Sequence, residues 1–569
     1  MSDSRRFCVR GFAAGGSLGG GQCSIIYEVT ETGKKGTMPR RFPVASIATA
    51  LALLPGAASG QDTRALTDTL SAQAPLETEE GRLFLRVFET ISQYHSTALG
   101  DSALWERAID GLLEQLDDPY ARVFTPDEYG RFTETNTGNY AGIGVQISLL
   151  AGRVTVTAVF RDTPAEGAGM IVGDRIVWVE GHDARDWTLD QARDSIRGTP
   201  GTVVQIRVAR DGYEEPLPMT IVRDNVHVEA VQATLLDEGI AFLAIDRIAR
   251  GAADELDQAL REFGDLRALV MDLRRNPGGY LDESLRIVDL FLAPGQRLAS
   301  AEARGPTGIL ETQSWPARSP ARLVDTPIII LVDEFTASAA EIISGALQDH
   351  DRAVVLGQRT FGKGVVQTVY PLIAGRRISI TTGAWHTPLG RSLHRARHRD
   401  GTPVPEDEAE SQTIATLAGR ELRSDGGVFP DLEVAVDSFK PQEEALLNHA
   451  NQLRVPLAVR IEEYAFELAK DALEAGGAAP LPSSSFDGLA EQLVEEGMSS
   501  EIVDDPVARD YLDWRTQMRY LYRADAHGPM LGVLAQRDRV LARALELARS
   551  AASPAELFAR IAAMGDRQP

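Results

Sequence analysis

The chain has 569 residues, of which 43% are hydrophobic and 25% charged, ordinary values for a globular protein with several domains. Its formal net charge of −24 argues against nucleic-acid binding and against docking to anionic lipid, because both depend on clustered cations. Two cysteines, Cys8 and Cys23, are too few for a disulfide scaffold, a thiolate zinc site or an iron–sulfur cluster.

Residues 1–60 are interpreted as a leader that contains a signal peptide. A basic pair precedes the apolar run 44–54, which is too short to span a bilayer comfortably, and small residues follow at 57–60. We therefore expect translation to begin at Met38, cleavage near residue 60, and a periplasmic or secreted protein without a transmembrane anchor. The alternative is a buried helix with an irregular N-terminus.

Residues 61–124 are expected to form an N-terminal helical region. Apolar residues recur at i, i+3, i+4 and i+7 from Phe84 and again from Ile109, which is the spacing of one helix face. The Asp-Asp-Pro-Tyr sequence at 117–120 then predicts a turn.

Residues 125–213 are expected to form a small β domain, because short β runs alternate there with glycines. The predicted strands span 144–150, 154–160, 174–179 and 203–210, and a short helix spans 189–196.

Residues 214–436 alternate between strand and helix, which predicts an α/β core. The apolar runs are short and continuous, as in a sheet that is buried on both faces. The predicted strands are 240–245, 268–273, 328–332 and 354–356, and the predicted helices are 281–291 and 339–347. Residues 437–569 are predicted to be a helical C-terminal region, with a linker at 476–485 and a helix over 540–563.

The segment from Leu331 to Gln367 combines a nucleophile with a base. A strand, a small-residue turn and a helix would place Ser338 in the first helical turn, where unpaired N–H groups and the helix dipole stabilise negative charge. Serine needs a base to remove its proton, and Lys363, between two glycines, can serve if burial lowers its pKa. The alternative for Ser338 alone is helix capping, the commoner role of a serine there.

The same segment partly imitates a phosphate-binding loop, because Gly357 and the Gly362-Lys363 pair have the required spacing. Gly364 stands where a magnesium-binding Ser or Thr belongs, and the following Val-Val-Gln-Thr-Val-Tyr sequence predicts a strand instead of a helix. The acidic strand also precedes this loop, the reverse of the usual order. A nucleotidase is therefore disfavoured.

This region resembles the C-terminal processing peptidases, also called tail-specific proteases, which use a Ser–Lys dyad. Of the family pattern Ser-Ala-Ser-Ala-Ser-Glu-Ile, the chain keeps the middle serine, Ser338, and replaces the two flanking ones. The Phe-Gly-Lys-Gly…Gln motif is complete, and 25 residues separate Ser338 from Lys363, as in the family. The resemblance implies Ser338 as the nucleophile, Lys363 as the general base and Gln367 as the residue that orients the lysine.

The resemblance also implies an oxyanion hole. Its donors would be the N–H of Ala339 and that of a glycine in the Asn-Pro-Gly-Gly turn at 276–279. We prefer Gly278, with Gly279 as the open alternative. An ordinary strand-to-helix turn would explain the Asn-Pro-Gly-Gly sequence equally well.

Four further polar residues were considered for catalysis or metal binding. Asp349 lies where some family members have an aspartate linked to activity. It is about three helical turns from Ser338, so we expect a supporting or surface role. His386, His394 and His398 lack metal-site spacing and are interpreted as bystanders.

The β-rich segment resembles a PDZ domain of the variant found in these peptidases. A glycine-lined loop exposes N–H groups to a terminal carboxylate, and the adjoining strand edge accepts a peptide as a further strand. The alternative is a β domain that only supports the core. The expected loop residues are Ala141, Gly142, Ile143, Gly144 and Val145.

The sequence therefore predicts a multidomain α+β protein: an α/β, crotonase-like ββα-type peptidase core with an inserted PDZ domain and helical N- and C-terminal segments. The predicted function is an exported serine endopeptidase that binds free, apolar C-terminal tails of proteins and needs no metal or organic cofactor. The sequence does not decide whether the protein binds an adaptor protein or forms a homo-oligomer. The alternative function is a catalytically silent scaffold that binds protein C-termini.

Overall fold

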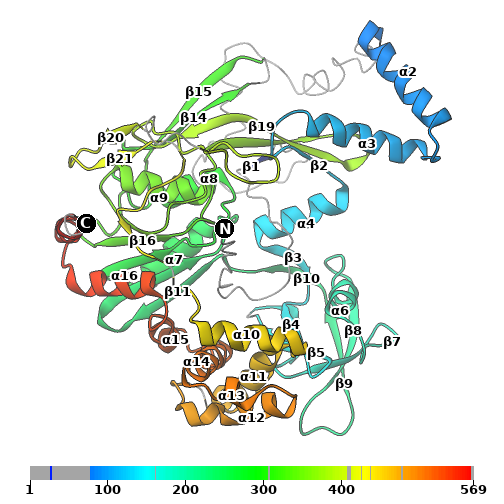
Figure 1. The fold of residues 1–569 in the computed structure, drawn as a ribbon, viewed down its shortest axis with the longest axis vertical. Helices are drawn as coiled ribbons and strands as arrows, with labels where there is room; N and C mark the ends of the chain where they lie inside the picture. The colour runs from blue at the N-terminus through cyan, green and yellow to red at the C-terminus, as the bar shows by residue number, and fades with distance from the viewer. Residues whose placement is uncertain are drawn as a thin grey trace, which may run out of the picture.

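The chain is a multidomain α+β protein built around three six-stranded sheets (Figure 1). A computed structural model describes residues 26–28, 77–160, 162–305, 308–405, 412–424, 426–435, 437–475 and 478–565. Of the expected leader only Ile26–Glu28 is described; it forms strand β1, parallel to β18 (Val365–Pro371). Met38 and the expected signal peptide lie outside the described residues. Within these ranges no helix has the length and apolarity needed to cross a membrane.

The core sheet has the order β11-β12-β13-β16-β17-β22. The pairs from β12 to β22 are parallel, and β11 is antiparallel to β12. Both faces are buried, which explains the continuous apolar runs predicted as strands. The strands are β11 (Val231–Leu236), β12 (Ile240–Ile245), β13 (Ala268–Asp272), β16 (Ile328–Val332), β17 (Val354–Gly357) and β22 (Leu432–Glu433).

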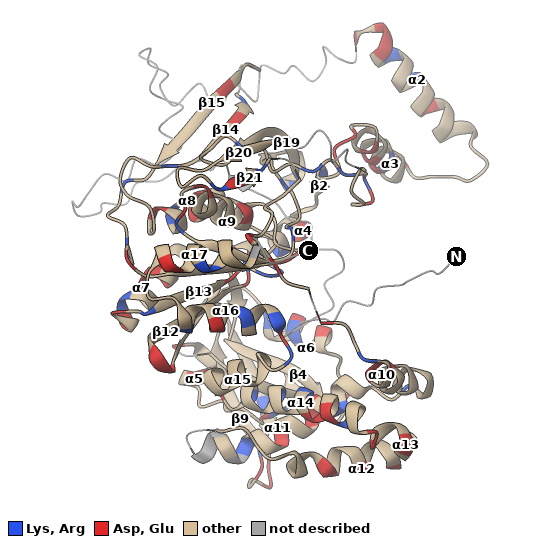
Figure 2. Cartoon of the chain, turned by 60° about the vertical axis from the view of Figure 1, so that its left-hand side comes forward, with Lys and Arg blue, Asp and Glu red and all other residues tan. Residues whose placement is uncertain are grey.

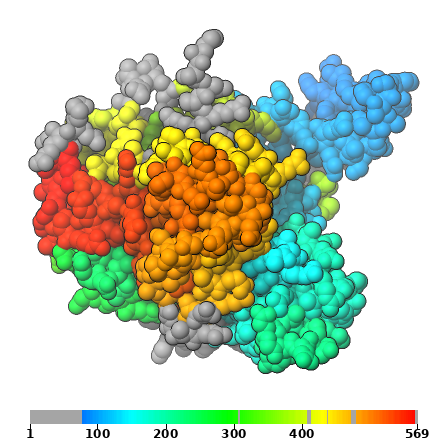
Figure 3. Space-filling model, turned by 60° about the horizontal axis from the view of Figure 1, so that its bottom comes forward, coloured from blue at the N-terminus to red at the C-terminus, as the bar shows by residue number. Residues whose placement is uncertain are grey.

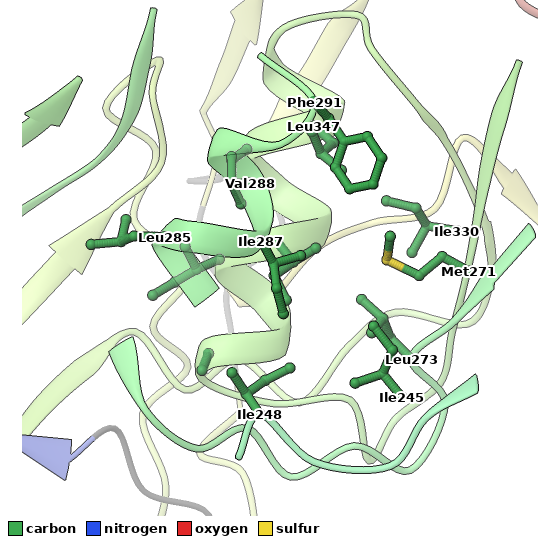
Figure 4. Packing of buried hydrophobic residues seen from close by; sticks show 14 of the residues in the cluster. Ile245, Ile248, Met271, Leu273, Leu285, Ile287, Val288, Phe291, Ile330 and Leu347 are labelled. Atoms are coloured by element: carbon green, nitrogen blue, oxygen red, sulfur yellow. The ribbon is translucent and has the colours of Figure 1, made fainter. Parts of the chain in front are cut away.

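One face of the core sheet is covered by three helices, α7 (Ala252–Phe263), α8 (Leu281–Asp289) and α9 (Ala339–Asp349), of which α9 is buried along its whole length. Figure 4 shows Ile287 of α8 and Phe291, which follows this helix, pointing toward Met271 and Ile330 of the sheet. Because α9 follows β16 directly, the carboxyl ends of the parallel strands and the start of α9 meet at one edge of the core. Ligand sites of open α/β sheets form at such an edge.

A second sheet has the order β1-β18-β19-β14-β15, and β2 pairs with β19. Its strand β2 comes from the N-terminal region, so the small β domain is inserted between two parts of the core. Besides β1 and β18, its strands are β2 (Arg122–Phe124), β14 (Arg297–Arg304), β15 (Leu310–Pro316) and β19 (Arg377–His386). A separate hairpin pairs β20 (Thr413–Ala415) with β21 (Glu421–Arg423).

The third sheet belongs to the PDZ domain and has the order β4-β5-β6-β8-β9, with β7 paired to β6. The boundary expected at residue 213 is too early, because β9 (Leu217–Val222) pairs antiparallel with β8. The turn before β9 contains Gly212 and Pro216 and resembles a domain end in sequence, but it closes a hairpin. The other elements are β4 (Val145–Leu150), β5 (Arg153–Val159), α5 (Pro164–Gly167), β6 (Arg175–Val179), β7 (His182–Asp183), α6 (Leu189–Ile196) and β8 (Val203–Ala209).

The N-terminal helical region contains α2 (Glu79–Tyr94) and α3 (Asp101–Glu114). Helix α4 (Pro126–Thr137) falls inside the range 125–213 expected for the β domain but precedes the sheet of that domain, which begins with β4, so the boundary expected at residue 125 is too early. Phe88 of α2 stacks on Trp105 of α3, with 4.0 Å between the ring centroids. The two-stranded sheet of β3 (Asn139–Gly142) and β10 (Asp224–His227) then joins the PDZ domain to the core.

The C-terminal region is helical, as predicted, and charged residues of both signs are spread along its helices (Figure 2). The helix expected over 540–563 is two helices, because Pro554 begins a new one after a break at 551–553. Part of this region completes the core: α16 packs on the sheet face opposite α7–α9. The division expected at residue 436 therefore does not separate two packing units. The helices are α10 (Pro441–Leu453), α11 (Leu457–Ala475), α12 (Asp487–Glu495), α13 (Ser500–Val503), α14 (Pro506–Arg523), α15 (His527–Leu534), α16 (Arg539–Ser550) and α17 (Pro554–Gly565).

Candidate active site

Ser338 lies between β16 and α9, at the carboxyl edge of the core sheet. Its φ of 60° and ψ of −119° are unusual for a residue other than glycine, and such backbone strain is concentrated at functional sites. The hydroxyl is buried and has no hydrogen-bond partner among the described residues. Ser338 thus occupies the cap position of α9, but its side-chain oxygen is not used for capping.

Lys363 is fully buried at the end of the loop that follows β17. Its Nζ donates a hydrogen bond to Oε1 of Gln367 (2.8 Å), so the expected contact between these two side chains is present. The same Nζ lies 4.2 Å from the centroid of the Tyr120 ring. Because the hydroxyl of Ser338 makes no hydrogen bond, the direct Ser338–Lys363 bond is not formed in this conformation.

The carboxylate of Glu341 connects the loop of the nucleophile to the loop of the lysine. Oε2 accepts hydrogen bonds from the N–H of Ser338 (2.7 Å) and of Lys363 (2.8 Å). Oε1 accepts from the N–H of Gly362 (2.7 Å) and from the hydroxyl of Thr360 (2.5 Å). Complete burial raises the pKa of Glu341, and these four hydrogen bonds oppose that shift. Sequence reasoning missed this role, although a glutamate three residues after a serine is the capping-box spacing.

Gly278 lies against the nucleophile and has a φ of 97°. A Cβ there would be 2.7 Å from the Cβ of Ser338 and 2.9 Å from the N of Ala339, so only glycine fits. In this conformation the N–H of Gly278 donates to Oδ1 of Asn276 (2.8 Å). The two expected oxyanion donors, Ala339 and Gly278, are therefore neighbours, and the side chain of Asn276 holds the N–H of Gly278.

A turn from the N-terminal region holds Gln367. Nε2 of Gln367 donates to the carbonyl oxygen of Tyr120 (2.8 Å), which leaves Oε1 facing the lysine. Oδ1 of Asp118 accepts from the N–H of Tyr120 (2.9 Å), and Oδ2 accepts from the N–H of Thr381 in β19 (3.0 Å). The sequence identified 117–120 only as a turn, because 247 residues separate Tyr120 from Gln367.

Replacing Gln367 by leucine is expected to lower kcat by about 100-fold and to change KM little, because a misplaced base costs roughly that much in rate. Leucine cannot accept the hydrogen bond of Lys363 or donate one to Tyr120. Steady-state cleavage kinetics measure kcat and KM separately. Thr368→Val on the same strand is the control, because Thr368 bonds to Thr382 instead (2.8 Å). Equal kcat values for the two variants would contradict an orienting role.

Asp349 is buried and has a supporting structural role. It forms an ion pair with Arg391, whose Nε donates to Oδ1 (2.9 Å), and Oδ2 accepts from the N–H of Leu389 (2.8 Å). These contacts fix the segment that leads to His394, whose backbone lies against Gly364 beside the lysine. The surface role that was also considered is wrong.

The three histidines, His386, His394 and His398, lie in the loops and strand around the lysine. Among the described residues no group of three or more His, Cys, Asp or Glu side chains could hold a metal ion. His394 is the one close to the candidate dyad: burial lowers its pKa, and the charge of Arg397 lowers it further. The loop of Gly357–Lys363 leads into strand β18, as expected for a segment that is not a phosphate-binding loop.

The expected carboxylate loop of the PDZ domain connects β3 to the edge strand β4. Ala141 and Gly142 belong to β3, Ile143 is buried in the core of the domain, and Val145 begins β4. Gly144 has a φ of 88°. Burial raises the pKa of Tyr140, and the backbone amides of Gly144 and Val145 act on its hydroxyl in the opposite direction. The amides of Gly144 and Val145 therefore lie beside the hydroxyl of Tyr140.

Two parts of the chain match known families: residues 239–400 match peptidase family S41, and residues 155–210 match the PDZ domain. The carboxy-terminal-processing protease of Bartonella bacilliformis is 33% identical over 313 residues, which cover 54% of this chain and 71% of that protein. The carboxyl-terminal-processing protease of Synechocystis sp. is 31% identical over 319 residues, which cover 55% of this chain and 72% of that protein. Among solved structures, the photosystem II D1 C-terminal processing protease matches with 23% identity and a TM-score of 0.33, covering 64% of this chain and 95% of that one.

Identity above 30% over more than two thirds of both relatives establishes the relationship beyond a shared fold. The chain therefore belongs to peptidase family S41 and is a serine peptidase of the C-terminal processing type that carries a PDZ domain.

Proposed function

We propose that the chain is an exported serine endopeptidase that receives the free C-terminal tail of a protein substrate in its PDZ domain and hydrolyses a peptide bond with Ser338 and Lys363. The observation that best supports the dyad is the set of hydrogen bonds that the Glu341 carboxylate accepts. By binding the N–H groups of Ser338 and Lys363 together, this carboxylate brings the two candidate residues into one buried site.

In the proposed reaction, substrate binding closes the hydrogen bond between Oγ of Ser338 and the neutral amine of Lys363, since catalytic hydrogen bonds are often open before substrate arrives. The lysine takes the hydroxyl proton while Oγ attacks the scissile carbonyl carbon. The tetrahedral oxyanion is held by the N–H groups of Ala339 and Gly278, and Gly278 exchanges its bond to Asn276 for this one.

The protonated lysine then gives its proton to the leaving amine, so the C–N bond breaks and an ester of Ser338 remains. A water molecule, deprotonated by the same lysine, attacks the ester carbonyl. The acid product leaves and Ser338 regains its proton. Gln367 keeps Nζ in position throughout.

The proposed tail site lies between the loop 141–145, β4 and α6. Strand β4 is at the edge of its sheet, so an extended tail can add to it as a further strand, and the amides of the loop bind the terminal carboxylate. Export rests on the sequence pattern of residues 38–60. The exported protein would begin near residue 61, so it would keep the second sheet without its edge strand β1.

The test is a cleavage time course with the chain from Gln61, wild type beside Ser338→Ala. The substrate is an unfolded protein with an apolar tail, compared with copies that end in charged residues or in a C-terminal amide. We expect cleavage by the wild type alone, fastest on the free apolar tail. Cleavage by Ser338→Ala would overturn the nucleophile, and equal rates on all three tails would overturn tail recognition.

A further inference from the structure

The amine of Lys363 lies over the aromatic ring of Tyr120. Its Nζ is 4.2 Å from the centroid of that ring, well within the roughly 6 Å at which a cation is attracted to an aromatic face. Tyr120 and Lys363 are 8% and 0% exposed, so water screens this contact little. The ring and Oε1 of Gln367 (2.8 Å) are therefore both close neighbours of Nζ in a buried site.

The backbone of Tyr120 holds the ring in place. Its carbonyl oxygen accepts from Nε2 of Gln367 (2.8 Å), and its N–H donates to Oδ1 of Asp118 (2.9 Å). The helices α2 and α3 of the same N-terminal region project at one side of the molecule (blue in Figure 3), whereas this turn reaches the dyad. Tyr120 lies outside the range 239–400 that matches peptidase family S41. A substitution of its side chain removes the ring and keeps the backbone groups that make these bonds.

The charge of Nζ changes during the proposed reaction. The amine is neutral before it takes the proton of Ser338, and it is an ammonium until it gives that proton to the leaving amine. Burial favours the neutral amine over the ammonium. The face of an aromatic ring carries negative electrostatic potential, so it stabilises the ammonium more than the amine. The ring of Tyr120 therefore lowers the free energy of the state that proton transfer creates.

Other titratable or charged residues lie on the elements packed around Lys363. Burial raises the pKa of Glu341, whose carboxylate accepts from the N–H of Lys363 (2.8 Å), and burial lowers the pKa of His394. All of these residues stay in place when only the ring of Tyr120 is changed, so a comparison among Tyr120 variants reports the ring. They are Glu341 of α9, Asp118 of the N-terminal turn, and His394, Arg395 and Arg397 of the segment after β19.

We propose that the ring of Tyr120 is part of the catalytic base: it stabilises the ammonium of Lys363 that forms when the amine takes the proton of Ser338. This inference rests on the proposed function. It makes the N-terminal region part of the catalytic site, with the carbonyl oxygen of Tyr120 orienting the lysine through Gln367 and the ring acting on its charge. Because the ring favours the ammonium, its removal moves the titration of Lys363 to lower pH and slows proton transfer.

The first test follows the titration of Lys363 directly, apart from activity. The chain has only five lysines, Lys34, Lys35, Lys363, Lys440 and Lys470, so full-length Ser338→Ala protein labelled with 13Cε-lysine gives few NMR signals. The signal that is lost in Lys363→Met is the one to follow, and the other lysines are internal references. In Tyr120→Leu we expect its midpoint about one pH unit lower, as roughly expected for one cation–π contact in a buried site. Tyr120→Phe keeps the ring and should keep the midpoint.

A second variant changes the ring without changing its shape. At position 120, 3,4,5-trifluorophenylalanine packs like phenylalanine, but its fluorines withdraw charge from the ring face, so the midpoint should fall below that of Tyr120→Phe. The thermal midpoint of unfolding checks that each variant is folded. Equal Lys363 midpoints in Tyr120→Phe, Tyr120→Leu and the trifluorophenylalanine variant would overturn the inference.

The second test is the pH dependence of kcat/KM in the active enzyme. Activity should be lost as the pH falls, because Lys363 becomes protonated, and this acid limb should lie about one pH unit lower in Tyr120→Leu. The plateau at higher pH should fall about tenfold, since one pH unit and a tenfold change in rate are equal free energies. A loss of packing alone would lower the plateau without moving the acid limb.

Tyr370→Leu is the matched control, because Tyr370 lies on β18 and is 37% exposed. It should change neither the acid limb nor the plateau. A Lys363 midpoint that shifts in Tyr120→Leu while the acid limb stays in place would contradict Lys363 as the general base, which belongs to the proposed function. An acid limb that is the same in Tyr120→Phe and Tyr120→Leu, together with equal midpoints, would remove the ring from catalysis and leave the dyad intact.

Discussion

Replacing Lys363 by methionine is expected to reduce peptide hydrolysis by at least about 10⁴-fold and to leave the fold intact. Removing one member of a nucleophile–base unit typically abolishes its whole contribution, because the nucleophile stays protonated. Methionine has a similar length and no charge. Since Lys363 is fully buried, the substitution also removes the cost of burying an amine, so we expect an unchanged or higher Tm.

Cleavage of an unfolded substrate and thermal unfolding of the same preparations measure the two effects. Lys470→Met is the control, because Lys470 is partly exposed on α11 and pairs with Glu467 (2.9 Å). It should keep normal activity. A Lys363→Met enzyme with more than about 1% of wild-type kcat/KM would show that another group acts as the base.

Replacing Glu341 by alanine is expected to lower both stability and activity. The N–H groups of Ser338, Gly362 and Lys363 would lose their acceptor while buried, and each unsatisfied group costs about 1–3 kcal/mol. We therefore expect the free energy of unfolding to fall by at least about 3 kcal/mol, which is large for a single substitution. The loops of Ser338 and Lys363 would also lose their common anchor, so kcat should fall by 100-fold or more, as roughly expected when catalytic groups are misplaced.

Glu341→Gln separates these two effects, because it keeps the size of the side chain and one acceptor oxygen. Its NH2 group would face N–H donors, so we expect a smaller loss of stability but still a clear loss of kcat. Denaturant unfolding and single-turnover kinetics are the measurements. If Glu341→Ala is destabilised but still reacts at the wild-type single-turnover rate, then Glu341 stabilises the fold and has no role in catalysis.

The sequence by itself identified the elements whose signals are local. The strand runs 240–245 and 328–332 and the helix 189–196 appear with the predicted bounds, because each buries a contiguous or periodic apolar pattern. Ser338 and Lys363 were predicted in the same way, from a short local motif, and Gln367 was predicted from the family resemblance of that motif. Two local patterns led to wrong predictions. The turn at 212–216 resembled the end of a domain, but it closes a hairpin. The Ala- and Leu-rich segment 540–563 resembled one helix, but it forms two helices, because Pro554 begins the second.

Tertiary structure alone decided how these elements act together. The carbonyl oxygen of Tyr120 holds Gln367 from 247 residues away, and Asp349 pairs with Arg391 across the core. The sequence also did not predict the role of the C-terminal region. Its helix α16 covers the core sheet, and its helix α14 lines a cavity beside the PDZ domain. Periodicity shows which face of a helix or strand is buried, but it does not show which other element packs against that face. Partners far apart in sequence are selected by packing and by the satisfaction of buried polar groups, which exist only in the folded chain.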